Sequence, residues 1–148
     1  MVESVGIDVR WRQRFANFSR ALARLDSAIT GGRLAEYSEL ELEGIIQRFE
    51  YTFELAWKTL KDYLEYSGVE ITQATPRKVI KECFAVGIFD EADIDAEIFL
   101  EMISARNDLS HTYDISRFEL ALDRISSLYL AELLKEENFL RKIAAADA

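Results

Sequence analysis

The sequence predicts an all-α protein, folded as an antiparallel up-and-down bundle of four main helices plus one short helix. Three observations predict this class. Hydrophobic residues recur at spacings of three and four over most of the chain, whereas no segment of useful length alternates as a strand does. Residues that start and stop helices divide the chain into segments. Only short loops separate these segments, which favours antiparallel neighbours.

The first two predicted helices carry the longest apolar stripes. The stripe of the first helix consists of Trp11, Phe15, Phe18, Leu22, Leu25 and Ile29, and Gly31-Gly32 is expected to end that helix. The second helix opens with the capping box Ser38-Glu39-Leu40-Glu41 and runs to Ser67, where Gly68 supplies the left-handed stop. Its apolar set is wide enough to face more than one neighbour, which predicts that it is the central helix.

Three further helices are predicted from their end signals. Thr75 caps a short helix that begins at Pro76 and runs to about Val86, with Gly87 closing it. A fourth helix begins at about Asp93. The last helix begins at a second capping box, Ser116-Arg117-Phe118-Glu119, and continues into the Ala-rich tail.

Composition indicates a single domain spanning residues 1–148. The chain is 49% hydrophobic and 30% charged, and its length is sufficient to bury a core without metal or disulfides. Its one cysteine, Cys83, is expected to be a small buried hydrophobe in the third helix. We find no pattern of a secretory signal and no apolar run of about 20 residues. These features predict a cytoplasmic protein without a membrane span.

The charges are unevenly distributed along a chain whose net charge is -9. Five arginines and no acid occur in the basic strip, which consists of Arg10, Arg12, Arg14, Arg20 and Arg24. Six acids and no base occur from Asp90 to Glu101. Each run is typical of a solvated helix face. An alternative hypothesis is that the basic strip meets RNA or an acidic partner.

The central helix offers two alternatives to a purely structural role. Phe49, Tyr51, Phe53 and Trp57 have core spacing, although such rings also stack on bases. Glu50 and Glu54 lie one turn apart and would hold a metal only with help from a partner residue. With one histidine in the chain and no Glu-x-x-His pattern, a salt-bridged helix face is the preferred interpretation, and no metal is expected.

The segment from Arg106 to Tyr113 concentrates the chain's chemistry and holds its only histidine, His111. If the helix persists that far, Arg106 and Tyr113 lie about 20° apart in projection, and Asn107, His111 and Asp114 form an adjacent stripe. Arg106 and His111 are then about 140° apart, too far to share a small ligand rigidly within one subunit. A dimer packed across this edge would bring an Arg and a His from each copy into one cleft.

Such a cleft suits phosphodiester transfer. An imidazole gains and loses its proton near neutral pH, so two copies supply a base and an acid. A guanidinium stabilises the charge that develops on phosphate oxygens. The structural alternative is that His111 faces free carbonyls at a helix C-terminus while Arg106 pairs with a carboxylate on a neighbouring helix.

The segment resembles the R-x4-H-x-Y motif of the HEPN superfamily. Three further segments resemble its nucleotidyltransferase substrate-binding branch, in the order of that family: residues 47–62, 75–80 and 110–114. The resemblance covers about residues 11 to 135. It departs from the family pattern at Ile98-Phe99-Leu100, where relatives often have a Trp.

The resemblance implies a dimeric HEPN toxin of a toxin–antitoxin pair, encoded beside a minimal nucleotidyltransferase. Arg106 and His111 would be the catalytic residues of a metal-independent ribonuclease that needs no cofactor, with Asn107 or Asp108 in support. The partner would silence it by transferring AMP to Tyr113 (AMPylation). Alternatively, the protein is a non-catalytic subunit that helps its partner bind a nucleotide substrate. A plain helical adaptor, in which the segment is structural, also remains open.

Overall fold

The computed structural model describes residues 2–30, 36–111 and 113–146. The described chain is helical and contains no strand, which confirms the predicted all-α bundle. Its elements are α1 (Val2–Thr30), α2 (Glu39–Tyr66), α3 (Pro76–Ala85), α4 (Ile88–Ala92), α5 (Ala96–Ser110), α6 (Ile115–Arg124), the π-helical segment η2 (Ile125–Tyr129) and α7 (Leu130–Ala146).

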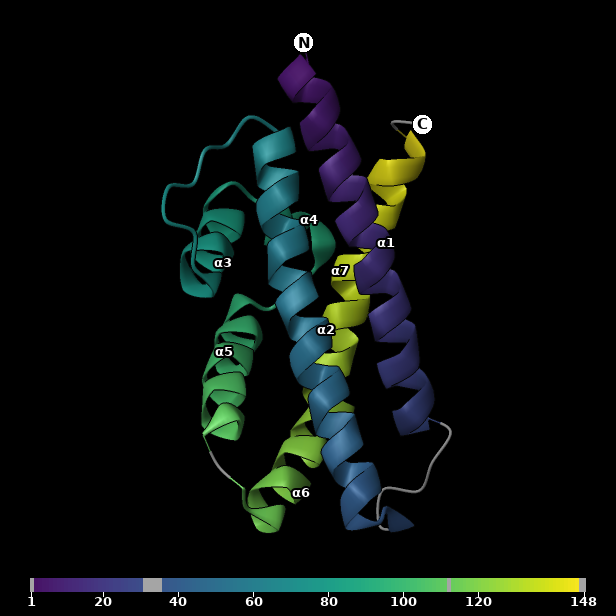
Figure 1. Cartoon of the computed structure of the whole chain (residues 1–148). Helices are drawn as coiled ribbons and strands as arrows, with labels where there is room; N and C mark the ends of the chain where they lie inside the picture. The colour runs from purple at the N-terminus through teal and green to yellow at the C-terminus, as the bar shows by residue number, and fades with distance from the viewer. Residues whose placement is uncertain (1, 31–35, 112, 147–148) are drawn as a thin grey trace.

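The helices run up and down along one long axis (Figure 1). Helix α1 packs against α2 over much of its length, and α6, η2 and α7 together form a third long segment. Helices α3 and α5 follow one another along the side of α2 away from α1 (Figure 1). The shared neighbour is therefore α2, as expected of a central helix. Its packing positions one edge of α5 beside α2.

Helix ends follow the sequence signals in some places and depart from them in others. Ser38 and Glu41 form the predicted capping box of α2, and the Thr75 hydroxyl accepts the Lys78 amide at the start of α3. The predicted second capping box is wrong, because Asp114 caps α6 by accepting the Ser116 amide. Its carboxylate competes successfully with a hydroxyl for the free helix donors. The predicted stop at Gly31-Gly32 lies outside the described residues.

Two features of the helix pattern were not predicted. Helix α4 occupies Ile88–Ala92, held by the buried side chains of Ile88 and Phe89, and α5 then begins at Ala96 with Asp95 as its cap. The last predicted helix contains the π-helical segment η2, which passes directly from α6 into α7. Such wide turns insert a residue into an α-helix and change the face that the next turn presents.

The core is built from large side chains of all the long helices. Trp11, Phe18, Phe49 and Phe99 are completely buried, and the rings of Phe49 and Tyr129 stack at a centroid distance of 5.5 Å. The predicted burial of Phe53, Trp57 and Cys83 is confirmed. Tyr51 is the exception among the central-helix aromatics, because 61% of it is exposed. In the described part of the chain, no helix has both the length and the hydropathy needed to cross a bilayer.

A carboxyl group in this core makes stability depend on pH. Glu136 of α7 is fully buried, and neither of its carboxyl oxygens has a hydrogen-bond partner among the described residues. Burial, with a smaller effect of Glu137, raises the pKa of Glu136 well above its usual value of 4.5. The folded chain therefore keeps this group protonated, whereas the unfolded chain ionises it. The free energy of unfolding is therefore highest below pH 4.5, where both states are protonated. It falls as the pH rises from 4.5 to the raised pKa of the folded chain.

The Glu136→Gln protein should lack this loss, because an amide does not ionise. Its stability relative to the parent protein should grow by up to about 1.4 kcal/mol per pH unit above the usual glutamate pKa, until the folded-state pKa is reached. Urea unfolding at a series of pH values measures the difference. The exposed Glu119→Gln change on α6 is the control. Parallel stability curves for the parent and Glu136→Gln proteins would contradict an ionisable buried group.

Candidate functional site

The motif segment, residues 106–113 without Thr112, lies at the end of α5 and the turn into α6. Burial of Phe99, Met102, Ile103 and Leu109 fixes the inner face of α5. The helix ends at Ser110, and the His111 amide donates to the Asp108 carbonyl at 3.2 Å. The helical projection expected for Tyr113 is therefore wrong, since Tyr113 lies beyond the helix.

Arg106 faces the central helix. Its Nη2 atom lies 3.2 Å from Oε2 of Glu54, and both side chains are about one-third exposed, at 37% and 30%. Its Nε atom is buried and has no partner among the described residues. Unsatisfied buried donors are uncommon in folded proteins. The structural alternative, in which Arg106 pairs with a carboxylate of a neighbouring helix, thus describes the isolated subunit correctly.

Glu54 is held as an anion by several donors. Burial raises its pKa, but hydrogen bonds from Trp57 and Lys58 and the charges of Lys58 and Arg106 outweigh burial and bring the pKa below its usual value. Trp57 Nε1 lies 3.2 Å and Lys58 Nζ 3.1 Å from its carboxylate oxygens. The carboxylate therefore keeps two other donors if Arg106 leaves.

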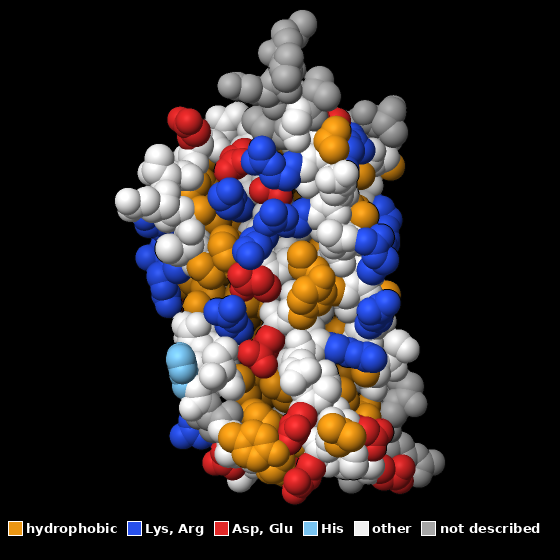
Figure 2. Space-filling view, viewed as in Figure 1, with side chains coloured by type: hydrophobic (Ala, Val, Ile, Leu, Met, Phe, Trp, Pro, Cys, Tyr) orange, Lys and Arg blue, Asp and Glu red, His pale blue; other side chains and the backbone are white. Residues whose placement is uncertain are grey.

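His111 does not join Arg106 in the single subunit. The imidazole side chain is exposed, on the outer surface beside α5 (Figure 2), and no hydrogen bond links it to Arg106 among the contacts of the described residues. Asn107 and Asp108 are exposed as well. In the described chain, the carboxylate that pairs with Arg106 is Glu54, and the supporting role predicted for Asn107 or Asp108 stays a prediction. The catalytic roles predicted for Arg106 and His111 consequently depend on a second copy.

Tyr113 presents its phenol at the surface. The residue is 76% exposed, its hydroxyl donates a hydrogen bond to Glu43 of α2, and its ring meets Phe118 edge to face at 6.0 Å. The hydrogen bond to Glu43 and the negative charge of that carboxylate raise the pKa of the phenol. A proton acceptor is thus already in contact with the hydroxyl. This position is accessible to another macromolecule.

Three carboxylates of α2, Glu43, Glu50 and Glu54, contact the motif segment. They are seven and four residues apart, so they lie on one face of the helix. Glu43 contacts Tyr113, and Glu54 contacts Arg106. Between them, Glu50 accepts a hydrogen bond from the Ser110 hydroxyl at 3.2 Å. Sequence reasoning missed Glu43 and considered Glu50 and Glu54 only as metal ligands or as a salt-bridged face. The salt-bridged face is confirmed for Glu54, which pairs with Lys58 and Arg106, whereas Glu50 contacts the Ser110 hydroxyl.

The ion pair between Arg106 and Glu54 should contribute little to stability. Partly exposed pairs are worth about 0–1 kcal/mol, because water screens the charges. In a double-mutant cycle with Glu54→Gln and Arg106→Gln, the coupling energy from urea unfolding should fall within that range. A coupling several times larger would show that Arg106 is locked in place and is not free to bind a phosphate.

The fold and the motif segment define a helical bundle of the HEPN-like class. Residues 13–142 match the family described as nucleotidyltransferase substrate binding protein like. The crystal structure of a protein from Thermus thermophilus superposes with a TM-score of 0.70 at 34% sequence identity, over 84% of this chain and 98% of that one. No curated protein sequence matches. The chain belongs to the nucleotidyltransferase substrate binding protein like family.

Proposed function

We propose that this protein is the HEPN-type component of a two-gene module with a minimal nucleotidyltransferase, and that its dimer is a metal-independent endoribonuclease. The observation that carries this proposal is the accessibility of the motif segment: His111 and Tyr113 are exposed, and Arg106 is partly exposed, at one end of α5. These three side chains are therefore within reach of a phosphate-bearing ligand.

The chemistry is balanced by groups of the protein and of the RNA alone. One His111 takes the proton of a ribose 2′-hydroxyl, whose oxygen attacks the adjacent phosphorus. The bond from phosphorus to the 5′-oxygen breaks, and the second His111 protonates that leaving oxygen. Arg106 stabilises the charge on the phosphate oxygens. The products carry a 2′,3′-cyclic phosphate and a 5′-hydroxyl.

A second copy supplies what the single subunit lacks. No hydrogen bond joins Arg106 and His111 among the described residues, so we infer that a symmetric pair packed across the end of α5 brings them together. Two large exposed hydrophobic residues, Leu40 and Leu120, belong to the elements that meet at this end. Their burial would favour association.

The bound phosphate replaces Glu54 as the partner of Arg106. The ion pair is partly exposed and weak, and Glu54 keeps Trp57 and Lys58 as donors when the guanidinium turns away. A guanidinium binds phosphate through two parallel hydrogen bonds. The acidic face of α2 therefore acts as a resting position for Arg106.

The nucleotidyltransferase partner regulates the site through Tyr113. The phenolic oxygen attacks the α-phosphorus of ATP, pyrophosphate leaves, and Glu43 is positioned to accept the phenolic proton. The attached AMP adds bulk and negative charge at the end of the motif segment, in the path of an RNA strand that approaches Arg106 and His111. Modification therefore blocks cleavage.

A second candidate function is a non-catalytic subunit that helps the nucleotidyltransferase bind its substrate. The family description and the neutralisation of Arg106 by Glu54 favour it. The two candidates are separated by incubating the purified protein with RNA in EDTA and analysing the ends of the products. Cleavage that leaves cyclic phosphates supports the ribonuclease. A stable complex with the transferase, without cleavage, supports the binding subunit.

A further inference from the structure

The basic strip of α1 separates into two parts. Its first three arginines each reach a carboxylate within 3.4 Å: Arg10 with Glu65, Arg12 with Asp8 and Arg14 with Asp62. Arg20 and Arg24 have no carboxylate partner among the described residues. The first part is a partly exposed helix face whose arginines form ion pairs with acids of α1 and α2. The second part carries positive charge that the described chain does not neutralise.

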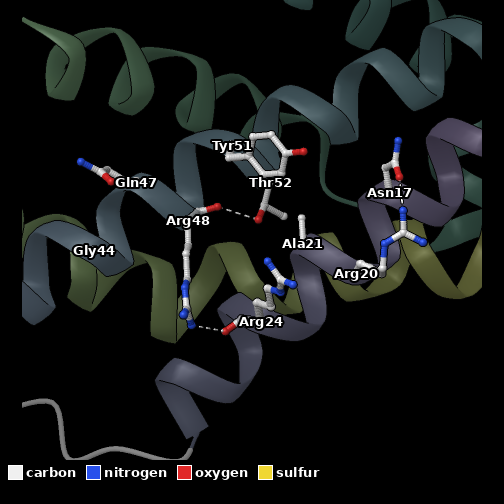
Figure 3. Close-up of a pocket in the computed structure, with 9 residues that line it drawn as sticks. All are labelled: Asn17, Arg20, Ala21, Arg24, Gly44, Gln47, Arg48, Tyr51 and Thr52. Carbon is white, nitrogen blue, oxygen red and sulfur yellow. Dashed lines mark hydrogen bonds between the residues drawn. The ribbon is translucent and has the colours of Figure 1, made fainter.

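Arg20 and Arg24 line a groove between α1 and α2 together with Arg48 of α2 (Figure 3). The groove has a volume of about 440 Å³, and its lining contains no acid among the described residues. We call it the arginine groove and define it by Asn17, Arg20, Arg24, Gln47, Arg48 and Tyr51. Its size lies within the range of small-ligand sites.

Local hydrogen bonds orient these guanidinium groups without neutralising them. Arg48 donates to the Arg24 carbonyl at 3.0 Å, and Arg20 donates to the Asn17 side-chain oxygen. The sticks in Figure 3 show the three arginines around the same hollow. Three uncompensated cations at one groove of a protein with net charge -9 form an anion site rather than part of a general basic surface.

Tyr51 adds a flat apolar surface to the arginine groove. It is 61% exposed, whereas Phe49 and Phe53 on the same helix are buried. Exposed aromatic rings beside arginines are typical of sites that stack nucleobases while cations hold the phosphates. An acidic protein segment would use the arginines but has no need of the ring. The ligand with both features is a nucleotide chain.

The shape of the groove favours a strand over a single nucleotide. Gly44 and Arg48 also line an adjoining hollow bounded by Ser27, Tyr37 and Glu41, so the surface depression continues along α1 and α2, although, of these two hollows in the described chain, only the arginine groove itself is lined without an acid. Arg20 and Arg24 lie one turn apart, about 6 Å along the helix axis. A ligand with several phosphates in a row matches this repetition.

The arginine groove adjoins the candidate cleavage site through α2. Tyr51 follows Glu50, which accepts the hydrogen bond from Ser110 in the motif segment. Consecutive residues of a helix point about 100° apart, so the two sites occupy neighbouring faces of α2. A strand bound in the groove can therefore extend over the edge of α2 toward Arg106.

We propose that the arginine groove binds single-stranded RNA, with Arg20, Arg24 and Arg48 contacting successive phosphates and Tyr51 stacking on a base. As the binding track of a substrate, this inference rests on the proposed ribonuclease function. As a binding site, it is testable without cleavage. The groove then holds the strand while the motif segment acts on it.

Fluorescence anisotropy with a labelled 2′-O-methyl RNA oligonucleotide tests the proposal, because this probe lacks the attacking 2′-hydroxyl. The Arg24→Gln/Arg48→Gln protein should bind at least tenfold more weakly, and Tyr51→Ala about tenfold more weakly. The plot of log K against log salt concentration should become less steep, by about 0.7 for each phosphate contact removed. Arg77→Gln, which changes one exposed charge on α3, should bind as the parent does.

Competition and stability measurements make the result decisive. Affinity unchanged in the double variant, or lost equally in Arg77→Gln, would overturn the proposal, as would equal competition by polyglutamate or ATP at matched charge concentration. Thermal melting of each variant excludes unfolding as the cause. If the parent protein binds RNA through the groove but cleaves none, the ribonuclease proposal fails and the groove stands. If the parent protein cleaves RNA but the groove variants bind RNA as tightly as the parent does, the groove proposal fails and the ribonuclease stands.

Discussion

RNA cleavage by the Arg106→Ala and His111→Ala proteins is expected to fall at least a hundredfold below that of the parent protein. Loss of a general acid or base costs about 10²–10⁴ in rate, and loss of a charge-stabilising donor costs about 10²–10³. The assay is cleavage of labelled RNA in EDTA, because the proposed chemistry uses no metal. Both changes are at accessible positions, so the fold should be retained.

The matched control for this loss is Arg141→Ala, which removes an exposed arginine from α7. It should cleave at the parent rate. Thermal melting of all three variants separates lost chemistry from lost structure. Undiminished cleavage by both motif variants would exclude the proposed site. No cleavage by the parent protein, with normal binding of the transferase, would favour the non-catalytic subunit.

Co-expression with the cognate nucleotidyltransferase should add AMP to the parent protein and none to Tyr113→Phe. Phenylalanine keeps the ring contact with Phe118 and removes only the attacking oxygen. Intact-mass spectrometry measures the added AMP units, and peptide mapping locates them. The modified protein should also lose RNA cleavage, since the bulk and negative charge added at the end of the motif segment should hinder the binding of an RNA strand.

Tyr51→Phe is the control for simple accessibility. Tyr51 and Tyr113 are both largely exposed, at 61% and 76%, but of these two only Tyr113 donates its hydroxyl to a carboxylate of the described chain. Tyr51→Phe should therefore be modified as the parent is. An unmodified parent protein in the presence of ATP and active transferase, or equal modification of Tyr113→Phe, would remove this mechanism.

Local signals predicted the fold well because they act within one or two helical turns. The caps at Ser38 and Thr75 are confirmed, and the apolar stripe of α2 correctly predicted the central helix. Asp114 was missed because its carboxylate precedes a sequence that resembles a capping box. Helix α4 was missed because five residues are too few to show helical periodicity.

The candidate site was only half predictable. The motif segment is contiguous, so Arg106, His111 and Tyr113 were recognised from sequence. Their partners Glu43 and Glu54 come from α2, many residues away, and no local pattern specifies which carboxylate a helix edge will meet. Their spacing on one face was the available signal.

The basic strip shows the same limit. Five arginines without an intervening acid suggested one basic surface. In the structure the first three pair with acids of α1 and α2, whereas Arg20 and Arg24 have no such partner among the described residues. Arg48, which completes the arginine groove, belongs to a different helix. Tyr51 was assigned to the core because aromatic residues at helical spacing usually pack there, but its position on α2 leaves it exposed. Packing between helices, rather than composition, decides these outcomes.

The most direct test of the shared site is the activity of a defined heterodimer. One subunit is the parent chain and the other is His111→Ala, and two different affinity tags allow the mixed dimer to be purified. If both imidazoles serve one cleft as base and acid, the heterodimer should cleave RNA nearly as poorly as the His111→Ala homodimer. Cleavage at about half the parent rate would show that each subunit works alone and would contradict the shared site.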